Sequence, residues 1–432
     1  MNINFKEKFI KSTIILVIGG LLTKILGMLI RVIMTRTVGT TGIGLYMLIM
    51  PTFNLFITIA SLSLPSAISK LVAEDTRNNK KVVLGIIPIA LIFDFLLIII
   101  IFLSANFISS NLLQNNNLFY PILSIAVTLP FITTSSILRG YFFGKQKMFP
   151  HVFSNFIEQV TRIILIIIVT PYLLDKGITF AVSGLVLTNV ASELMSILIF
   201  LFFLPKKIKI KKDYIKPDPT YIKDIFSISI PTTLSRLISS ISLFLEPIIL
   251  TYVFLKLGYD NNYITYEYGI ITGYVFPMVM MPNFLTGAIS SALLPEITRN
   301  YAKNNIKEVK RRIKQSFFYS CLIGLPCCIF LFFFPSFSLN LIYSTTVGSN
   351  YLRYAAILFF ISYILGPLSS ILQTINKSKT IFTSNLIGSI IKIVLLYSLT
   401  YLDIGMTPLL ISYFISYLYI TIHQFKVMKK VL

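Results

Sequence analysis

Long apolar segments alternate with short basic loops along this chain, and the pattern excludes a water-soluble fold. Apolar residues make up 55% of the 432 residues and charged residues only 12%, which does not fit a soluble core of this length. Each segment has about 20 residues or more, enough for a helix to cross a bilayer. The sequence therefore predicts an all-α polytopic membrane protein with about twelve transmembrane helices. The predicted spans are residues 12–35, 44–69, 82–105, 118–138, 152–172, 179–204, 225–255, 268–295, 315–335, 352–375, 381–401 and 406–424.

Lysines and arginines lie mostly on one side of these spans. The loops on that side hold most of the 38 basic residues, whereas the other side holds only Arg36, Lys176, Lys256 and Arg353. Because basic loops stay in the cytoplasm, we expect both termini to be cytoplasmic. The net charge of +22 then reflects topology and contact with anionic membrane lipids, and no nucleic-acid partner is expected.

The second half of the chain repeats the first. The sequence Ser-Ser-Ile-Leu at 135–138 recurs at 369–372, and Ser154 before an asparagine recurs as Ser384. Since each half has an even number of spans, the halves are parallel repeats, and transporters place the substrate between such halves. We therefore predict two parallel six-helix lobes. The predicted domains are an N-terminal lobe of residues 1–212 and a C-terminal lobe of residues 213–432.

Charged side chains inside the spans are the first candidates for function, because each costs about 2.5–3.5 kcal/mol at the centre of a spanning helix. The basic candidates are Lys24, Arg31, Arg162, Arg236 and Lys392, and the acidic candidates are Asp94, Glu158, Glu193 and Glu246. Lys24 and Arg31 lie about two helical turns apart and project from one face, and Arg236 takes the place of Lys24 in the repeat. We expect the basic residues to line a central cavity that selects anions.

Each basic candidate also has a structural interpretation. Arg31 lies near the end of its span and is able to reach the lipid headgroups. Glu158 and Arg162 have the i, i+4 spacing of a helical ion pair. Lys392 has no such neighbour, because Gly388 stands where the repeat requires the equivalent of Glu158. Lys392 therefore needs a distant carboxylate or a ligand.

The four intramembrane carboxylates are candidates for two roles, pairing with the cations or binding a coupling proton or sodium ion. The sequence contains no phosphate-binding loop, no zinc-binding His-Glu-x-x-His and no dinucleotide fingerprint. We therefore predict no catalytic residue, no metal ligand and no cofactor. The energy for transport is expected from an ion gradient, the membrane potential or the gradient of the substrate.

Motifs in both halves carry a family resemblance. In the first half they are Lys24-Ile25-Leu26-Gly27, Arg31, Gly42-Ile43-Gly44-Leu45-Tyr46, Leu64 to Glu74, Arg139 to Gly144 and Glu158-Gln159 with Arg162; in the second half they are Ser235-Arg236-Leu237, Tyr268-Gly269, Pro277, Pro282, Leu294-Pro295 and Lys392. These segments resemble the stage V sporulation protein B group of polysaccharide and lipid-linked oligosaccharide flippases. The superfamily of that group also holds MATE exporters and MurJ-type lipid II flippases. The resemblance implies a MATE-like fold and a polyprenyl-pyrophosphate-linked saccharide as substrate.

One departure from that group concerns the number of helices. Its members usually carry fourteen, whereas about twelve are expected here. In related lipid flippases the last two helices help to form a groove for the lipid tail. The resemblance therefore leaves two possibilities open: the polyprenyl chain is held in another way, or the chain is truncated.

Taken with the cationic spans, the resemblance implies an alternating-access flippase of the bacterial cytoplasmic membrane. Its substrate would be an anionic polyprenyl-pyrophosphate saccharide, such as a peptidoglycan precursor, moved from the inner to the outer leaflet. The alternative is a MATE-like cation-coupled antiporter for small cationic or amphipathic compounds, which predicts a cavity of carboxylates and aromatic rings. A third interpretation, a scaffold that recruits cell-envelope synthesis enzymes through the basic loops, does not account for Lys24 and Arg236.

Overall fold

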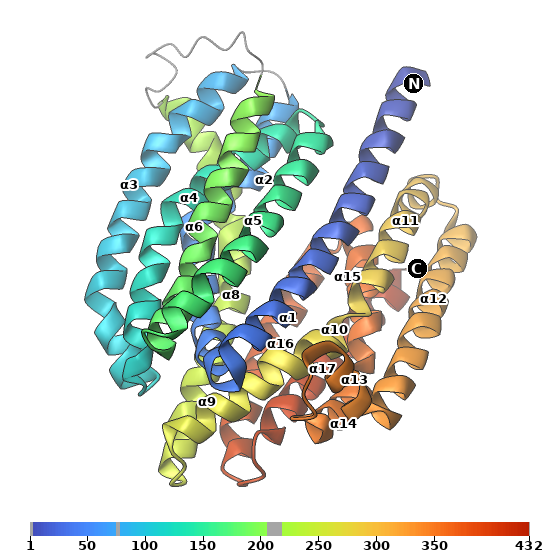
Figure 1. Cartoon of the computed structure of the whole chain (residues 1–432). Coiled ribbons are helices and arrows are strands. Elements are labelled where there is room, and N and C mark those ends of the chain that lie inside the picture. The colour runs from blue at the N-terminus through green and yellow to red at the C-terminus, as the bar shows by residue number, and fades with distance from the viewer. Residues whose placement is uncertain (1–2, 75–77, 205–217, 432) are drawn as a thin grey trace. The chain divides into compact units, whose positions relative to one another are not determined.

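The structure, a computed structural model, describes residues 3–74, 78–204 and 218–431. Throughout these residues the chain forms helices joined by short turns, and it forms no strand (Figure 1). The predicted all-α fold is confirmed. Two compact units make up the chain, Met1–Phe244 and Leu245–Leu432.

The N-terminal unit is a bundle of long helices. Its elements are α1 (Ile3–Ser61), α2 (Leu64–Glu74), α3 (Asn79–Asn106), η1 (Phe107–Leu112), η2 (Asn116–Leu118), α4 (Phe119–Gly144), α5 (Met148–Leu174), α6 (Ile178–Phe203) and the first part of α8 (Pro219–Lys256). Helices α3, α4, α5 and α6 lie side by side, and α1 packs along α5 (Figure 1). The long face of α3 that points away from the bundle carries exposed Phe95, Phe102 and Leu103, as expected for a helix that faces lipid.

Two glycines of α4 permit close packing against α2. A Cβ atom at Gly140 would lie 2.8 Å from the carbonyl oxygen of Pro65, and one at Gly144 would lie 2.7 Å from that of Ser69. Without hydrophobic driving force in lipid, helices associate through such close approach of backbones at small residues. The Gly-x-x-x-Gly spacing of α4 therefore holds α2 in place.

We predict that Gly144→Ala destabilises the protein by about 1–3 kcal/mol, because the added methyl group meets backbone atoms that cannot move alone. The measurement is the midpoint of thermal unfolding in detergent. Gly20→Ala is the matched control, since a Cβ there has no neighbour within 4 Å, and its midpoint should equal or exceed that of the wild type. Equal midpoints for the two variants would contradict the role of Gly144.

The C-terminal unit contains more breaks between its helices. Its elements are the end of α8, α9 (Asn261–Gly269), η3 (Ile270–Val275), α10 (Phe276–Met280), α11 (Asn283–Ala302), α12 (Ile306–Phe333), α13 (Pro335–Tyr343), α14 (Ser349–Leu358), η4 (Phe359–Ile361), α15 (Ser362–Thr374), α16 (Ser378–Thr400) and α17 (Thr407–Val431). The main contacts join α11 to α12 and α15, and α16 to α17.

Two of the predicted spans are interrupted. The span predicted at 44–69 breaks between α1 and α2, where Leu62 and Ser63 both have positive φ angles. The span predicted at 268–295 is divided into a π-helix, α10 and α11, with Pro277 at the start of α10. Proline lacks the N–H group that a helix interior needs, so Pro277 marks the start of α10.

Nine of the described helices are long and apolar enough to cross a membrane. Most of the residues predicted at 12–35 and 44–69 lie in the apolar segment Ile18–Glu74, on the two sides of a kink at Gly39, where φ is 68° and ψ is −173°. The interrupted segment 268–295 and helix α17 are not among the nine, since breaks shorten the first and polar residues such as Gln424 lower the hydropathy of the second. The number of crossings and the side of the termini therefore remain predictions.

The division between the two units falls inside α8. The first part of this helix packs on the N-terminal unit, with Ile225 buried in a cluster formed by α2, α3, α4 and α6. Thr58 Oγ1 and Ser240 Oγ lie 2.9 Å apart, which ties α8 to α1. The boundary predicted between residues 212 and 213 lies outside the described residues.

Candidate functional site

Three predicted cations carry charged groups that are free in the structure. Lys24 and Arg31 on α1 and Arg236 on α8 are all exposed, and all belong to the N-terminal unit. Within residues 3–74, 78–204 and 218–431, none of these charged groups has a hydrogen-bond or ion-pair partner. An anion is therefore able to contact them without first breaking an ion pair.

Arg162 belongs to a cluster of paired charges in the same unit. Its Nη2 atom lies 3.1 Å from Glu158 Oε1 and 3.3 Å from Ser192 Oγ. The predicted helical pair of Glu158 and Arg162 is thus present. Glu158 also accepts a longer contact of 3.4 Å from Arg139 on α4. The cluster contains two guanidinium groups around one buried carboxylate.

Arg31 and Arg162 lie in one region of the N-terminal unit. The charges of both act on the phenol of Tyr46, which is partly buried in the second half of α1. Helix α1 packs along α5, the helix that carries Arg162. The free cation on α1 and the paired cation on α5 therefore contribute to a common positive field.

Two further carboxylates of the N-terminal unit have a hydroxyl partner. Glu193 Oε2 accepts a short hydrogen bond of 2.5 Å from Ser135. Asp94 Oδ1 accepts one of 3.1 Å from Thr133, while Asp94 Oδ2 has no hydrogen-bond partner in the described structure. Both carboxylates are buried, so they remain candidates for a coupling ion.

A second network is fully buried in the C-terminal unit. Lys392 on α16 lies 3.1 Å from Glu246 Oε2 on α8, and the two side chains are only 6% and 2% exposed. Tyr413 donates to the same oxygen at 2.8 Å, and Tyr268 donates to Glu246 Oε1 at 3.1 Å. The Lys392 ammonium group also lies 4.6 Å from the centre of the Tyr413 ring. Lys392 thus has the distant carboxylate that its sequence context required.

Equivalent positions of the repeat join equivalent helix pairs. Ser154 on α5 lies 2.6 Å from Ser196 on α6, and Ser384 on α16 accepts a bond of 3.0 Å from Gln424 on α17. Gly388, which replaces the glutamate of the first half, leaves room for Ile420, whose side chain would lie 2.6 Å from an added Cβ. At this position the first half has an ion pair, whereas the second half has close packing of α16 on α17.

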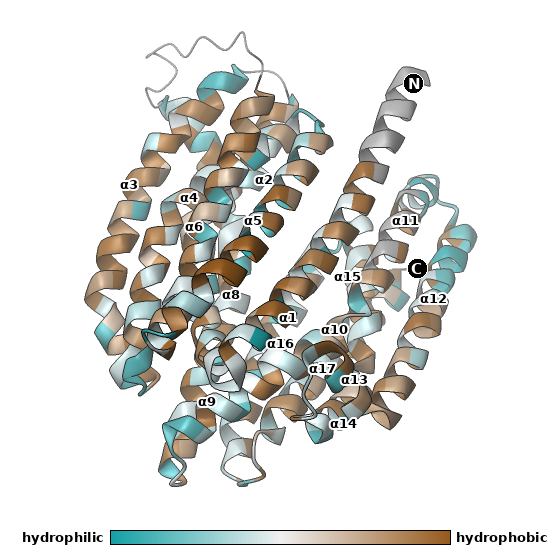
Figure 2. Ribbon diagram, viewed as in Figure 1, coloured by the Kyte–Doolittle hydropathy of each residue, from teal (hydrophilic) through white to brown (hydrophobic). Residues whose placement is uncertain are grey.

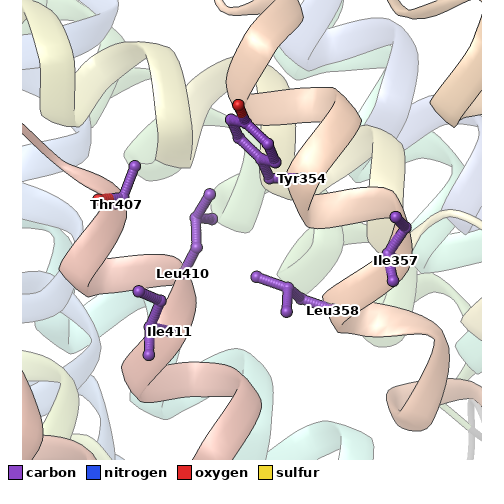
Figure 3. A pocket seen from close by; sticks show the side chains of 6 residues that line it. All are labelled: Tyr354, Ile357, Leu358, Thr407, Leu410 and Ile411. Atoms are coloured by element: carbon purple, nitrogen blue, oxygen red, sulfur yellow. The ribbon is translucent and has the colours of Figure 1, made fainter.

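A pocket in the C-terminal unit is apolar. Its volume is about 300 Å³, and it lies between α14 and α17 (Figure 3). The side chains that face it are Tyr354, Ile357, Leu358, Thr407, Leu410 and Ile411. No charged residue lines this pocket, so its chemistry fits hydrocarbon and not a phosphate group. In the described part of the chain no group of three or more His, Cys, Asp or Glu side chains is placed to hold a metal ion.

Several residues at these sites were not singled out from the sequence. Arg139 was expected in a loop, but α4 continues to Gly144 and brings the arginine to Glu158. Tyr268 was named only as part of a family motif and Tyr413 was not named, because a tyrosine in an apolar span carries no distinguishing signal. Only the unpaired Lys392 indicated that polar groups must gather around it.

The sequence also matches known protein families. Residues 9–301 match the family model described as polysaccharide biosynthesis protein, which covers more than half of the chain. The chain belongs to this family. The second half of the chain also matches the MatE family model, over residues 270–398. The suspected relationship is thereby confirmed.

Named relatives agree with the family. Stage V sporulation protein B of Bacillus subtilis (strain 168) is 34% identical over 404 residues, which cover 91% of this chain and 78% of that protein. The lipid II flippase MurJ of the same organism is 25% identical over 450 residues, which cover 96% and 82% of the two chains. This polysaccharide biosynthesis protein is therefore a multi-pass protein of the bacterial cytoplasmic membrane.

Solved structures show the same fold. An inward-facing multidrug resistance MATE family transporter of the MOP superfamily matches with a TM-score of 0.72 at 16% identity, covering 94% of both chains. The lipid II flippase MurJ in an inward closed conformation matches with a TM-score of 0.73 at 17% identity, covering 95% of this chain and 87% of that one. The predicted MATE-like fold is confirmed.

Proposed function

We propose that this protein moves an anionic polyprenyl-pyrophosphate-linked saccharide from the inner to the outer leaflet by alternating access. The single observation that carries the proposal is the set of three free cations, Lys24, Arg31 and Arg236. A charge in a membrane-spanning helix is costly and is normally paired or used by a substrate. A diphosphate group supplies the missing negative charge, and the similarity to a lipid II flippase and to polysaccharide biosynthesis proteins supports a lipid-linked substrate.

Within this proposal the basic residues have different roles. Lys24, Arg31 and Arg236 contact the diphosphate directly. Arg162 adds positive field beside Arg31 while it remains paired with Glu158. Lys392 is already neutralised by Glu246, so we assign it to the stability of the C-terminal unit instead of substrate binding.

The membrane potential supplies a driving force in the proposed direction. Moving one uncompensated negative charge outward across an inside-negative membrane releases about 2.3 kcal/mol per 100 mV. We also propose that a proton or sodium ion binds at Asp94 or Glu193 and that its gradient is coupled to transport. Each of these buried carboxylates has a hydroxyl partner and no bound lysine or arginine among the described residues.

The test is flipping of a fluorescent polyprenyl-diphosphate saccharide in liposomes that contain the purified chain. We expect headgroups to become accessible to an impermeant quencher faster than in protein-free liposomes. An imposed potential that is negative on the side of entry should increase the rate, and the opposite polarity should reduce it. Equal flipping rates with and without well-folded protein would contradict the proposal.

The alternative, export of small cationic compounds, is supported by the MatE family match over residues 270–398. It requires a carboxylate that is free to bind a cation. Glu246, which is surrounded by tyrosines, has the right environment, but Lys392 occupies it. Efflux of a cationic dye from the same liposomes, in the absence of flipping, would favour this alternative.

A further inference from the structure

A single face of α12 changes from basic to apolar along its length. One face of α12 packs against the rest of the unit, and its buried residues at helical spacing are Val309, Ile313, Ser316, Ser320 and Gly324. The exposed face begins with Lys307, Lys310, Arg311 and Lys314 and continues with Phe318, Leu322, Leu325 and Ile329. Figure 2 shows the same change, with α12 hydrophilic at one end and apolar along the rest.

Among the described residues, the only one of the four basic residues of this face that pairs with a carboxylate of its own unit is Arg311. Both carboxylates nearby, Glu296 and Glu308, are bound to Arg312, at 2.6 and 3.0 Å, and Arg312 lies to the side of the exposed stripe. Arg311 shares Glu308 at 2.8 Å. The three lysines of the stripe have no hydrogen-bond or ion-pair partner among the residues that the structure describes.

Spacing along the helix matches the dimensions of a lipid molecule. The four basic residues extend over about 10 Å of helix, and Phe318 follows Lys314 by about 6 Å, one turn further on. Phe318 and Leu322 are 62% and 57% exposed, so the apolar part of the stripe begins where the charges end. A lipid whose chains lie on these two side chains has its phosphate among the lysines.

We infer that this α12 face binds an anionic phospholipid, with the phosphate held by Lys307, Lys310, Arg311 and Lys314 and the acyl chains lying on Phe318 and Leu322. Charge complementarity selects an anionic headgroup, and continuity with the apolar stripe selects a lipid over a water-soluble acidic partner. The residues of this face belong to the C-terminal unit, and the proposed substrate cations belong to the N-terminal unit. Lipid binding at this face therefore does not depend on the proposed function.

The chain offers a direct test because it contains no tryptophan. Phe318→Trp introduces a single reporter beside the basic residues. In vesicles of phosphatidylcholine that contain a minor fraction of brominated lipid, bromine quenches a tryptophan only at close contact. We expect brominated phosphatidylglycerol to quench this reporter with an apparent affinity about fivefold or more above that of brominated phosphatidylcholine, the factor that one basic residue contributes near an anionic lipid.

Three controls separate a site from general attraction. Phe333→Trp places the reporter at the other end of α12, where the side chain is 65% exposed, and should show no preference between the lipids. Replacing the four basic residues by glutamine in the Phe318→Trp background should remove the preference. High salt should weaken the preference in the Phe318→Trp protein that keeps all four basic residues, which makes the test independent of how well the glutamine variant folds.

Each other outcome overturns the inference. Equal quenching by the two lipids at Phe318→Trp excludes a selective site. The same preference at both reporters shows only attraction to the whole protein. A preference that survives both the glutamine substitutions and high salt places the selectivity elsewhere.

Discussion

Lys392→Met is expected to be among the most destabilising single changes in this chain. It removes the ammonium group and leaves Glu246, which is 2% exposed, without its cation. Two tyrosine hydroxyls would still donate to the carboxylate, but they carry no compensating charge. Breaking a buried pair from one side costs about 3–5 kcal/mol. The measurement is the midpoint of thermal unfolding in detergent, together with the yield of monodisperse protein.

A second substitution should restore much of this loss. In the Glu246→Gln, Lys392→Met double variant no charge is left buried. The glutamine oxygen still accepts from one tyrosine hydroxyl, and the glutamine NH2 group donates to the other. We expect the double variant to unfold at a higher temperature than Lys392→Met alone. Lys379→Met, an exposed change on the same helix α16, is the matched control and should have little effect. A double variant no more stable than the single one would contradict a net charge penalty.

The repeat sharpens this expectation, because the equivalent change in the first half should be milder. Arg162→Met leaves Glu158 with a second guanidinium, that of Arg139 at 3.4 Å. Lys392 has no such substitute near Glu246 among the described residues. Both halves therefore have an intramembrane cation at this position, but the loss of stability on removing it should be larger for Lys392 than for Arg162.

Short-range features of the fold were predictable from the sequence, and long-range ones were not. The spacing of Glu158 and Arg162 is enough to predict their ion pair, because residues four apart meet on any helix. The same rule showed that Lys392 lacks a local partner. That the partner is Glu246 depends on how α8 packs against α16, which periodicity does not determine.

Breaks within spans were missed for a related reason. The interruption at Leu62 and Ser63, two consecutive residues with positive φ, lies just before Pro65 in the first turn of α2. Proline and serine mark this break, but mean hydropathy over 44–69 does not register it. The boundary predicted between residues 212 and 213 stays a prediction, and the contacts of Ile225 assign the start of α8 to the N-terminal unit.

Substitution of the free cations should abolish transport without unfolding the protein. In Lys24→Gln and Arg31→Gln the side chain loses its charge but breaks no ion pair or hydrogen bond within the described residues. Because a hydrogen bond to a charged group contributes about 1.5–3 kcal/mol, we expect each variant to flip the polyprenyl-diphosphate saccharide at least about tenfold more slowly. The unfolding midpoint should stay at the wild-type value.

Controls for these cations distinguish charge from position. Lys176→Gln removes an exposed charge of the same unit, in the turn between α5 and α6, and should leave flipping unchanged. Arg31→Lys keeps the charge but loses the planar, two-pronged contact that a guanidinium makes with phosphate, so it should retain part of the activity. Wild-type rates in a Lys24→Gln, Arg31→Gln double variant would exclude these residues from the substrate path. Variants of the free cations are therefore expected to stay folded but not to flip the saccharide. Variants of Lys392 are expected to lose stability first.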